Sequence, residues 1–325
     1  MRLRYDTDTV RWPDRYEFFR AAAASEVAPV AIRGRAPGRL RATLSSVQAG
    51  HFLVEAVSFA ADSETEFLRS DRMIRAGDPD CYRLCLNITG GEVIEQAGNQ
   101  VRFAPRDIGL YNLSSRYHSI RPATWQAVRV VMVTFPRRLL PLDEAAMTPL
   151  LGTLLPRGLA AHSPFAQFLT CLADGTGPDS EAGSLAGALG QATTALIGER
   201  LGAGSGFTPA VRRLLYREWA RLIVARRSGD PGLSPAEIAG ALNISTSYLH
   251  EIFRGSGQTP MQLVKAARLE HCHRDLQDPA HAGKPAGEIA IARGYKRPDQ
   301  FARDFRQRFG IPATQLRHPG PGRPA

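Results

Sequence analysis

Cysteine is scarce in this chain, and the long apolar runs of membrane proteins are missing from it. Only four cysteines occur among 325 residues, and Cys81 and Cys85 have no second pair at the spacing of a zinc site. No stretch approaches the roughly 20 uninterrupted apolar residues that a membrane helix needs. The first residues lack the apolar run of a secretion signal. We therefore expect a cytoplasmic protein without a membrane span.

Residue patterns of catalysis are equally scarce. The sequence has no paired carboxylates, nucleophile elbow or phosphate-binding loop. The run His271-Cys272-His273 offers metal-ligating side chains. Residues i and i+2 on a helix point about 200° apart, however, so the two histidines would not easily share a metal. We therefore expect neither an enzyme nor a bound metal or cofactor.

Positive charge is abundant, and it is concentrated in the last third of the chain. Residues 207–325 contain 19 lysines and arginines against 10 acidic residues, whereas residues 1–206 contain 22 against 21. A basic domain attached to a neutral one indicates a polyanionic partner for the basic part. No basic amphipathic helix with a bare aromatic face stands out, so the charge favours nucleic acid over a membrane surface.

The first half of the chain has the pattern of an antiparallel β-structure. Short runs rich in β-forming residues are separated by turn signals such as Gly90-Gly91 and Gly98-Asn99. The runs are Phe52–Ala60, Tyr82–Ile88, Glu92–Gln96, Val101–Phe103 and Gln126–Phe135. Several short strands at this spacing predict an antiparallel barrel or sandwich rather than alternating βαβ units.

After Pro136 the pattern becomes helical. Leucine and alanine recur at helical spacing in Arg137–Leu155, Pro164–Leu172 and Glu181–Leu201. The small, polar run Gly202–Gly206 is typical of an interdomain linker, and the charge balance changes at that point. We therefore predict an α+β protein with two domains, residues 1–206 and residues 207–325.

The basic domain contains one helix-turn-helix pattern twice. In the first copy, Leu233–Phe253, Ser234 is placed to cap a helix and Glu237 to complete a capping box. Asn243, which tolerates the left-handed conformation, occupies the turn, and Ser245 caps the second helix. The apolar positions that predict the buried faces are Ile238, Ala239, Leu242, Leu249, Ile252 and Phe253.

The second copy is Gly287–Phe309. Gly294 takes the place of Asn243 in the turn, and Arg297-Pro298 opens the second helix. Its apolar positions are Ile289, Ala290, Ile291, Phe301, Phe305 and Phe309. Matching positions are 51 residues apart in the first helices and 52 apart in the second helices. The second copy therefore has one extra residue in its turn.

Two such units in a basic domain favour DNA binding over a plain helical bundle. The major groove is about as wide as a helix, and the first helix of each unit braces the second. Residues Met261–Gln277 would form a connecting helix of about 25 Å, close to the ~34 Å of one duplex turn. Both second helices could therefore enter successive major grooves on one face of the duplex.

The last part of the chain, about 110 residues, resembles the AraC/XylS family of transcription regulators. The resemblance rests on LSPAEIAGALNIS, SYLHEIFR, EIAIARGY and FARDFRQRFG, on Arg268–Cys272 and on the closing Pro312 and Arg317. The N-terminal region resembles the cupin-like sensing domain of that family through RAGDPDCY, FAPRDIGLYNLSSRYHS and TFPRRLLPL. The resemblance implies a barrel that binds a small-molecule effector, a helical segment 137–201 for dimerisation or signal relay, and action near RNA polymerase.

The outer side of each second helix supplies the candidate DNA contacts. The positions expected to face bases are Thr246, Ser247, His250 and Glu251 in the first copy and Lys296, Arg297, Asp299, Gln300 and Arg303 in the second. The resemblance places family DNA-reading positions at Ser247, His250 and Glu251. Glu251 departs from the arginine or glutamine common in relatives, and a carboxylate is repelled by phosphates. The alternative for each position is a solvated helix face.

Two further arginines and one further histidine complete the candidates. Arg303 is best placed to contact a guanine, whereas Arg254 and Arg306 suit phosphates. In the barrel, His118 is a weak candidate for effector binding, because a lone histidine is more often satisfied or simply exposed. A metal-dependent cupin enzyme would need an HxH-type pair, and this stretch has only His51 and His118.

The sequence thus predicts a sequence-specific DNA-binding transcription regulator, an activator that responds to a small molecule. Its expected partners are double-stranded DNA, RNA polymerase and a second copy of itself, at the nucleoid. Two alternatives stay open. One is a constitutive architectural DNA-binding protein without an effector, and the other is an enzyme, either a metal-free cupin-type catalyst or a DNA-modifying enzyme tethered by the basic domain.

Overall fold

The computed structural model describes residues 1–25, 28–33, 38–140, 144–155, 164–174, 182–201 and 208–316. The chain divides into two compact units, Met1–Leu215 and Tyr216–Ala325. The predicted linker Gly202–Gly206 and the closing Arg317 lie outside the described residues. The predicted domain boundary at residue 206 therefore stays a prediction.

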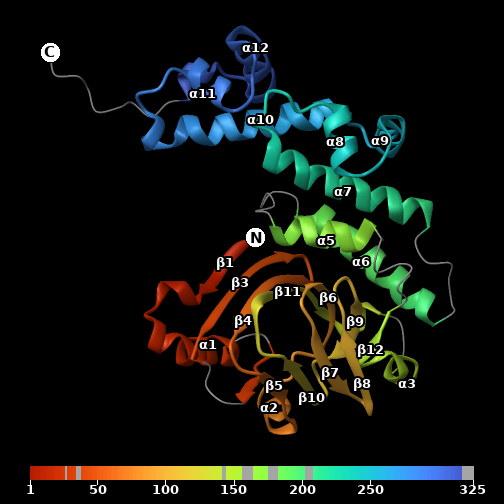
Figure 1. Ribbon diagram of the computed structural model, residues 1–325. Coiled ribbons are helices and arrows are strands. Elements are labelled where there is room, and N and C mark those ends of the chain that lie inside the picture. The colour runs from red at the N-terminus through yellow and green to blue at the C-terminus, as the bar shows by residue number, and fades with distance from the viewer. Residues whose placement is uncertain are drawn as a thin grey trace. The chain divides into compact units, whose positions relative to one another are not determined.

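The N-terminal unit is built on two sheets that form a barrel (Figure 1). In spatial order the larger sheet contains β1 (Arg2–Asp6), β3 (Leu40–Ala49), β4 (Phe52–Ala61), β11 (Thr124–Pro136), β6 (Cys81–Thr89), β9 (Ile108–Asn112) and β12 (Thr153–Leu154). The smaller contains β2 (Ala31–Arg33), β5 (Thr65–Arg69), β10 (Tyr117–Arg121), β7 (Glu92–Gln96) and β8 (Asn99–Phe103).

The strands of both sheets pair antiparallel, which confirms the predicted N-terminal barrel. Two packed antiparallel sheets are also the arrangement of cupin-like proteins. One predicted turn was misplaced by a residue. Because Gln96 pairs with Asn99, the turn between β7 and β8 is Ala97-Gly98 rather than Gly98-Asn99.

Alternate residues of each strand face the space between the sheets. In β10 the side chains of Tyr117, Ser119 and Arg121 are buried, whereas those of His118 and Ile120 are only half-buried. Successive side chains of a strand point to opposite faces, so the first three face inward and the other two outward. This alternation decides which polar side chains lie inside the barrel.

Helices cover the barrel at two places (Figure 1). Helix α1 (Arg15–Ala24) brings the buried Phe19 ring to 5.4 Å from Phe59 and 6.1 Å from Phe67, between the sheets. Helices α5 (Pro164–Asp174) and α6 (Ala182–Arg200) pack on strands of the larger sheet. The short helix α2 (Asp71–Ala76) follows β5. The helices therefore shield apolar side chains from solvent, both in the barrel interior and on the outer face of the larger sheet.

Residues 137–140 and 144–155, the described parts of the segment Arg137–Leu155, do not form the predicted helix. They fold into 3₁₀ turns at Arg137–Leu139 and Thr148–Leu150, the single-turn α3 (Glu144–Met147) and the strand β12. Strand β12 pairs with β9, and the backbone N–H of the next residue, Leu155, also donates to Ile108 (2.8 Å). The exposed edge of β9 offers hydrogen bonds that helical spacing alone cannot reveal.

The C-terminal unit is helical, as predicted. Helix α7 (Pro209–Arg227) leads into it. It is followed by α8 (Pro235–Ala241), α9 (Thr246–Phe253), α10 (Pro260–Gln277), α11 (Ala286–Ala292) and α12 (Pro298–Phe309). The pairs α8–α9 and α11–α12 are the two predicted helix-turn-helix units, and α10 connects them (Figure 1).

Candidate nucleic-acid interface

The first helix-turn-helix unit is capped at both of its helices. The Ser234 hydroxyl oxygen accepts a hydrogen bond from the backbone N–H of Glu237 (3.3 Å), and that of Ser245 accepts from Tyr248 (3.1 Å). These caps confirm the predicted helix starts. The predicted capping box is wrong in its second half, because the Glu237 carboxylate pairs with Arg227 (3.2 Å) instead of the cap backbone.

The two units turn in the same way. Asn243 has φ 54° and Gly294 has φ 89°, so both are left-handed as predicted. The next residue, Ile244 or Tyr295, donates its backbone N–H to a carbonyl of the preceding helix, at 3.0 Å in each unit. The N-cap of the second helix comes two residues after Asn243 but three after Gly294. The predicted extra residue in the second turn is thereby confirmed.

The second unit is held together by aromatic side chains. Phe301 and Phe305 are buried with ring centroids 5.4 Å apart, and Phe309 is half-buried against them, as their spacing predicts. The prediction that Ile291 is buried is wrong, because its side chain is 48% exposed. Ile289 occupies the inner side of α11, and a residue two positions further along a helix points about 200° away from it.

Helix α10 fixes both units to one another. A reciprocal capping box starts the helix, with the Thr259 hydroxyl accepting from Gln262 N–H (3.2 Å) and the Gln262 side chain accepting from Thr259 N–H (2.7 Å). Further along, the Arg268 guanidinium donates to the carbonyls of Ser228 and Asp230, each at 2.7 Å. The helix therefore braces the loop that enters the first unit.

The candidate DNA contacts are exposed in the structure. In α9 they are Thr246, Ser247, His250 and Glu251, with Arg254 just beyond, and around α12 they are Lys296, Arg297, Asp299, Gln300, Arg303 and Arg306. The opposite side of each helix is buried, by Leu249 in α9 and by Phe305 in α12. The polar side chains on α9 and on α12, the second helices of the two units and from here on called the recognition helices, therefore lie on the outer side of each helix.

A carboxylate organises the cations at the start of α12. Asp299 pairs with Arg297 (2.8 Å) and lies 3.7 Å from Arg303. The hydrogen bond from Arg297 is the main cause that holds the pKa of Asp299 below its usual range. All three side chains are largely exposed, so the contacts are weak and can be exchanged for contacts with DNA.

A cavity of about 550 Å³ lies within the C-terminal unit, between α8, α10 and α12. Lys265 pairs with Asp304 there (2.6 Å), and the candidate contacts Lys296 and Gln300 also line it. The sequence analysis missed Lys265, because its pairing with Asp304 depends on how α10 packs against α12. Burial raises the pKa of the adjacent Tyr295, so its hydroxyl stays protonated.

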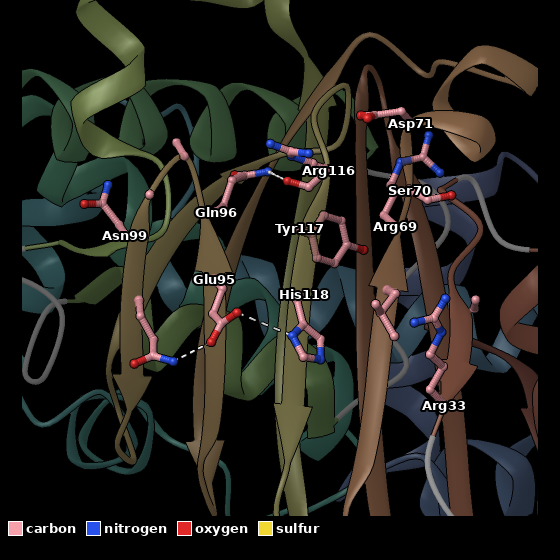
Figure 2. A pocket seen from close by; sticks show the side chains of 15 residues that line it. Arg33, Arg69, Ser70, Asp71, Glu95, Gln96, Asn99, Arg116, Tyr117 and His118 are labelled. Atoms are coloured by element: carbon pink, nitrogen blue, oxygen red, sulfur yellow. Dashed lines mark hydrogen bonds and ion pairs between the residues drawn. The ribbon is translucent and has the colours of Figure 1, made fainter.

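In the N-terminal unit His118 lies on the outer face of the smaller sheet. Its ring nitrogens contact Glu66 (3.1 Å) and Glu95 (3.4 Å), and Figure 2 shows it beside Glu95 on the neighbouring strand. The side chain lines a cavity of about 590 Å³ on this outer face. His118 therefore points away from the barrel interior. Its predicted contact with an effector stays a prediction, and it applies only to an effector in this outer cavity.

The barrel interior holds two ion pairs that the sequence analysis missed. Arg83 pairs with Glu55 (2.8 Å), and Arg121 pairs with Glu92 (3.2 Å). Burial by itself would lower the pKa of Arg83, but the Glu55 carboxylate raises it above its usual value, so the guanidinium stays charged. Charged residues at inward-facing strand positions were the available signal.

No group of three or more histidine, cysteine, aspartate or glutamate side chains in the described residues could hold a metal ion. None of the described helices is both long and apolar enough to cross a bilayer.

Comparison with known families matches both parts of the chain. Residues 19–224 match the AraC-binding-like domain, and residues 238–318 match a helix-turn-helix domain. The first match covers well over half of the 325 residues.

Sequence identity to individual relatives is low. The chain is 24% identical over 260 residues to the transcriptional activator NphR of Rhodococcus sp, which covers 77% of this chain and 73% of that protein. It is 35% identical over 89 residues to a probable thc operon regulatory protein of Rhodococcus erythropolis, covering 26% of each. The crystal structure of the AraC-like transcriptional activator CuxR superposes with a TM-score of 0.48 at 16% identity, over 87% of this chain and 98% of that one.

The AraC-binding-like match extends over the barrel, and the helix-turn-helix match extends over the two helix-turn-helix units. The two matches follow one another along the chain in the same order as these parts of the fold. They agree with the duplicated, outward-facing recognition helices of the C-terminal unit. The chain belongs to the AraC/XylS family and is a DNA-binding transcription regulator.

Proposed function

We propose that α9 and α12 bind successive major grooves on one face of a DNA duplex. The observation that carries this proposal is the structural repeat, in which two units with the same turn are joined by one helix. Helix α10 has 18 residues, which corresponds to a length of about 27 Å. That length is close to the ~34 Å between equivalent points on successive duplex turns.

The proposed base contacts are the exposed side chains of the two recognition helices. They are Thr246, Ser247, His250, Glu251, Lys296, Arg297, Asp299, Gln300 and Arg303, with Arg254 and Arg306 on phosphates. Arg303 is the favoured guanine contact, because an arginine fork matches guanine O6 and N7. Its exposed contact with Asp299 leaves the fork available. Glu251 could accept a hydrogen bond from cytosine N4.

We further propose that residues 1–206 bind a small effector and change DNA engagement near RNA polymerase. The AraC-binding-like match and a cavity inside the barrel, lined by both polar and apolar side chains, support this role. The name of the relative NphR, a transcriptional activator, favours activation over repression. We propose that the active species is a homodimer, with segment 137–201 at its interface, that acts at the nucleoid in the cytoplasm without catalytic activity of its own.

Replacing Arg303 by alanine is expected to separate base contacts from phosphate contacts. The variant should lose about 1–3 kcal/mol of binding free energy on a selected site and little on random DNA, because a base contact contributes only where its base is present. Fluorescence anisotropy with both duplexes, at several salt concentrations, measures this difference.

Arg306→Ala is the matched control for that experiment. A phosphate contact contributes on any duplex, so this variant should weaken both complexes equally and reduce the salt slope by about one. Equal losses for Arg303→Ala on selected and random DNA would reassign Arg303 to the phosphate backbone.

A further inference from the structure

The interior of the N-terminal barrel is lined by both polar and apolar side chains. A cavity of about 80 Å³ lies between the two sheets. The polar part of its lining consists of Arg83, Glu92, Tyr111, Tyr117, Ser119 and Arg121. The apolar part consists of Phe19, Ala23, Leu44, Val57, Phe67 and other apolar side chains. A few polar groups set against an apolar wall are typical of small-molecule sites.

The charges around this cavity are already balanced. Arg83 has Glu55 as its partner, and Arg121 has Glu92 (2.8 and 3.2 Å). The Glu92 carboxylate also accepts from the Ser119 hydroxyl (3.2 Å). No lysine or further arginine lines the cavity within the described residues. An anionic ligand would therefore add an uncompensated buried charge, which is strongly unfavourable.

Two hydrogen-bond donors at this cavity, in contrast, share one weak acceptor, although Nε and Nη2 of Arg83 bind oxygens of Thr134 and Glu55, each at 2.8 Å. Nη1 of Arg83 has the thioether sulfur of Met132 as a partner (3.5 Å), and the Tyr111 hydroxyl points at the same sulfur (3.8 Å). The guanidinium and the Tyr111 hydroxyl also hydrogen-bond to one another. Because a thioether is a weak acceptor, one sulfur leaves these two donors poorly satisfied.

Tyr117 supplies a further donor. Its ring centroid lies 5.1 Å from that of Tyr111, and its side chain lines the same cavity. Burial raises the pKa of both tyrosines, so the two hydroxyls stay protonated and able to donate. An oxygen acceptor on a ligand would therefore give the Tyr111 hydroxyl and Nη1 of Arg83 a stronger partner than the Met132 sulfur.

The size of the cavity limits the ligand. Its volume of about 80 Å³ is roughly half of the 150 Å³ of an engineered cavity that binds benzene. A larger body would have to displace Phe19 and Ala23 of α1, which belong to the apolar part of the lining. A bound ligand would then move α1. This displacement would be the means by which ligand binding in the barrel changes the activity of the regulator.

We infer that the barrel binds a small, uncharged molecule with an oxygen acceptor at one end and an apolar body at the other, such as a ketone, rather than a carboxylate. The inference rests on the proposed effector-binding role of the N-terminal domain and names the chemical class of its ligand. The acceptor lies against Arg83 and Tyr111, and the apolar body lies against Phe19 and Phe67.

Pairs of compounds with equal shape and different charge test this class. The full-length protein is titrated with 3-methyl-2-butanone against isobutyrate and with acetophenone against benzoate, and thermal unfolding is recorded. The ketones should stabilise the protein and the acids should not. Tyr111→Phe should weaken ketone binding about three- to tenfold, because it removes one hydrogen-bond donor and little volume. Tyr82→Phe is the control, since Tyr82 is buried on the opposite face of β6.

The outcomes distinguish the ligand class from the proposed effector-binding role. Stabilisation by the acids that depends on Tyr111 would overturn the neutral class and retain the barrel as the effector site. Stabilisation by any compound that is unchanged in Tyr111→Phe would place the ligand elsewhere and overturn the inference. A complete lack of stabilisation would overturn both the class and the barrel site, and would leave the DNA contacts, which Arg303→Ala tests, untouched.

Discussion

Gly294→Ala is expected to unfold the second helix-turn-helix unit at a much lower temperature than in the wild type. A Cβ at this position would lie 2.6 Å from the carbonyl oxygen of Ser228 and 3.0 Å from the backbone of Gly229. Neither atom can withdraw easily, because Arg268 binds that same Ser228 carbonyl. The left-handed conformation adds its own cost for alanine. We expect a loss of about 2–5 kcal/mol from strain and overpacking together.

Calorimetry of the full chain measures this loss as a fall of roughly 10–20 °C in the transition of the C-terminal unit. Gly310→Ala is the matched control, because Gly310 is also left-handed (φ 75°) and a Cβ there would meet no atom within 4 Å. It should cost only the conformational part, about 1–2 kcal/mol. Equal losses of stability in the two variants would show that the close contact between residue 294 and the loop after α7 does not contribute to the destabilisation.

Glu55→Gln is expected to destabilise the barrel strongly. The Glu55 and Arg83 side chains are only 1% and 7% exposed, and the substitution keeps the shape of Glu55 while leaving the Arg83 charge without its counter-ion. Breaking a buried pair from one side costs about 3–5 kcal/mol. Urea unfolding of the N-terminal unit measures the change in the free energy of unfolding.

An exposed pair on the same unit provides the control for Glu55. Glu17 contacts Arg20 at 3.0 Å, but the two side chains are largely exposed, so Glu17→Gln should change stability by at most about 1 kcal/mol. The double variant Glu55→Leu/Arg83→Met should recover most of the loss, because it removes both charges. A Glu55→Gln variant as stable as Glu17→Gln would contradict the assigned ion pair.

The C-terminal unit could be predicted from the sequence because its signals are local. Caps at Ser234 and Ser245, left-handed residues at Asn243 and Gly294 and the 51-residue repeat each involve neighbours along the chain. Ile291 was misassigned because apolar character alone does not fix which side of a seven-residue helix a residue occupies. The candidate DNA contacts followed from the same helical geometry, and Lys265 was missed because its ion pair with Asp304 depends on packing between α10 and α12.

The barrel interior could not be predicted in the same way. Glu55 and Arg83 are 28 residues apart, and Glu92 and Arg121 are 29 apart, on strands whose pairing the sequence does not specify. Only the order of the strands in the two sheets brings these side chains together. His118 attracted attention as a lone histidine, yet its neighbours Tyr117 and Ser119 are the residues that face the interior. Short runs indicate strands, but they do not reveal which polar residues share a cavity.

The most direct test of the account is selection of binding sites by the full-length protein from a pool of randomised duplexes, followed by sequencing. Two recognition helices on one face predict two clusters of preferred bases whose centres lie about 10–11 base pairs apart. The Arg303→Ala variant should lose the preference in one cluster and keep it in the other. A pool without enrichment, or with a single cluster that Arg303→Ala leaves unchanged, would contradict the central claim that both units bind DNA specifically.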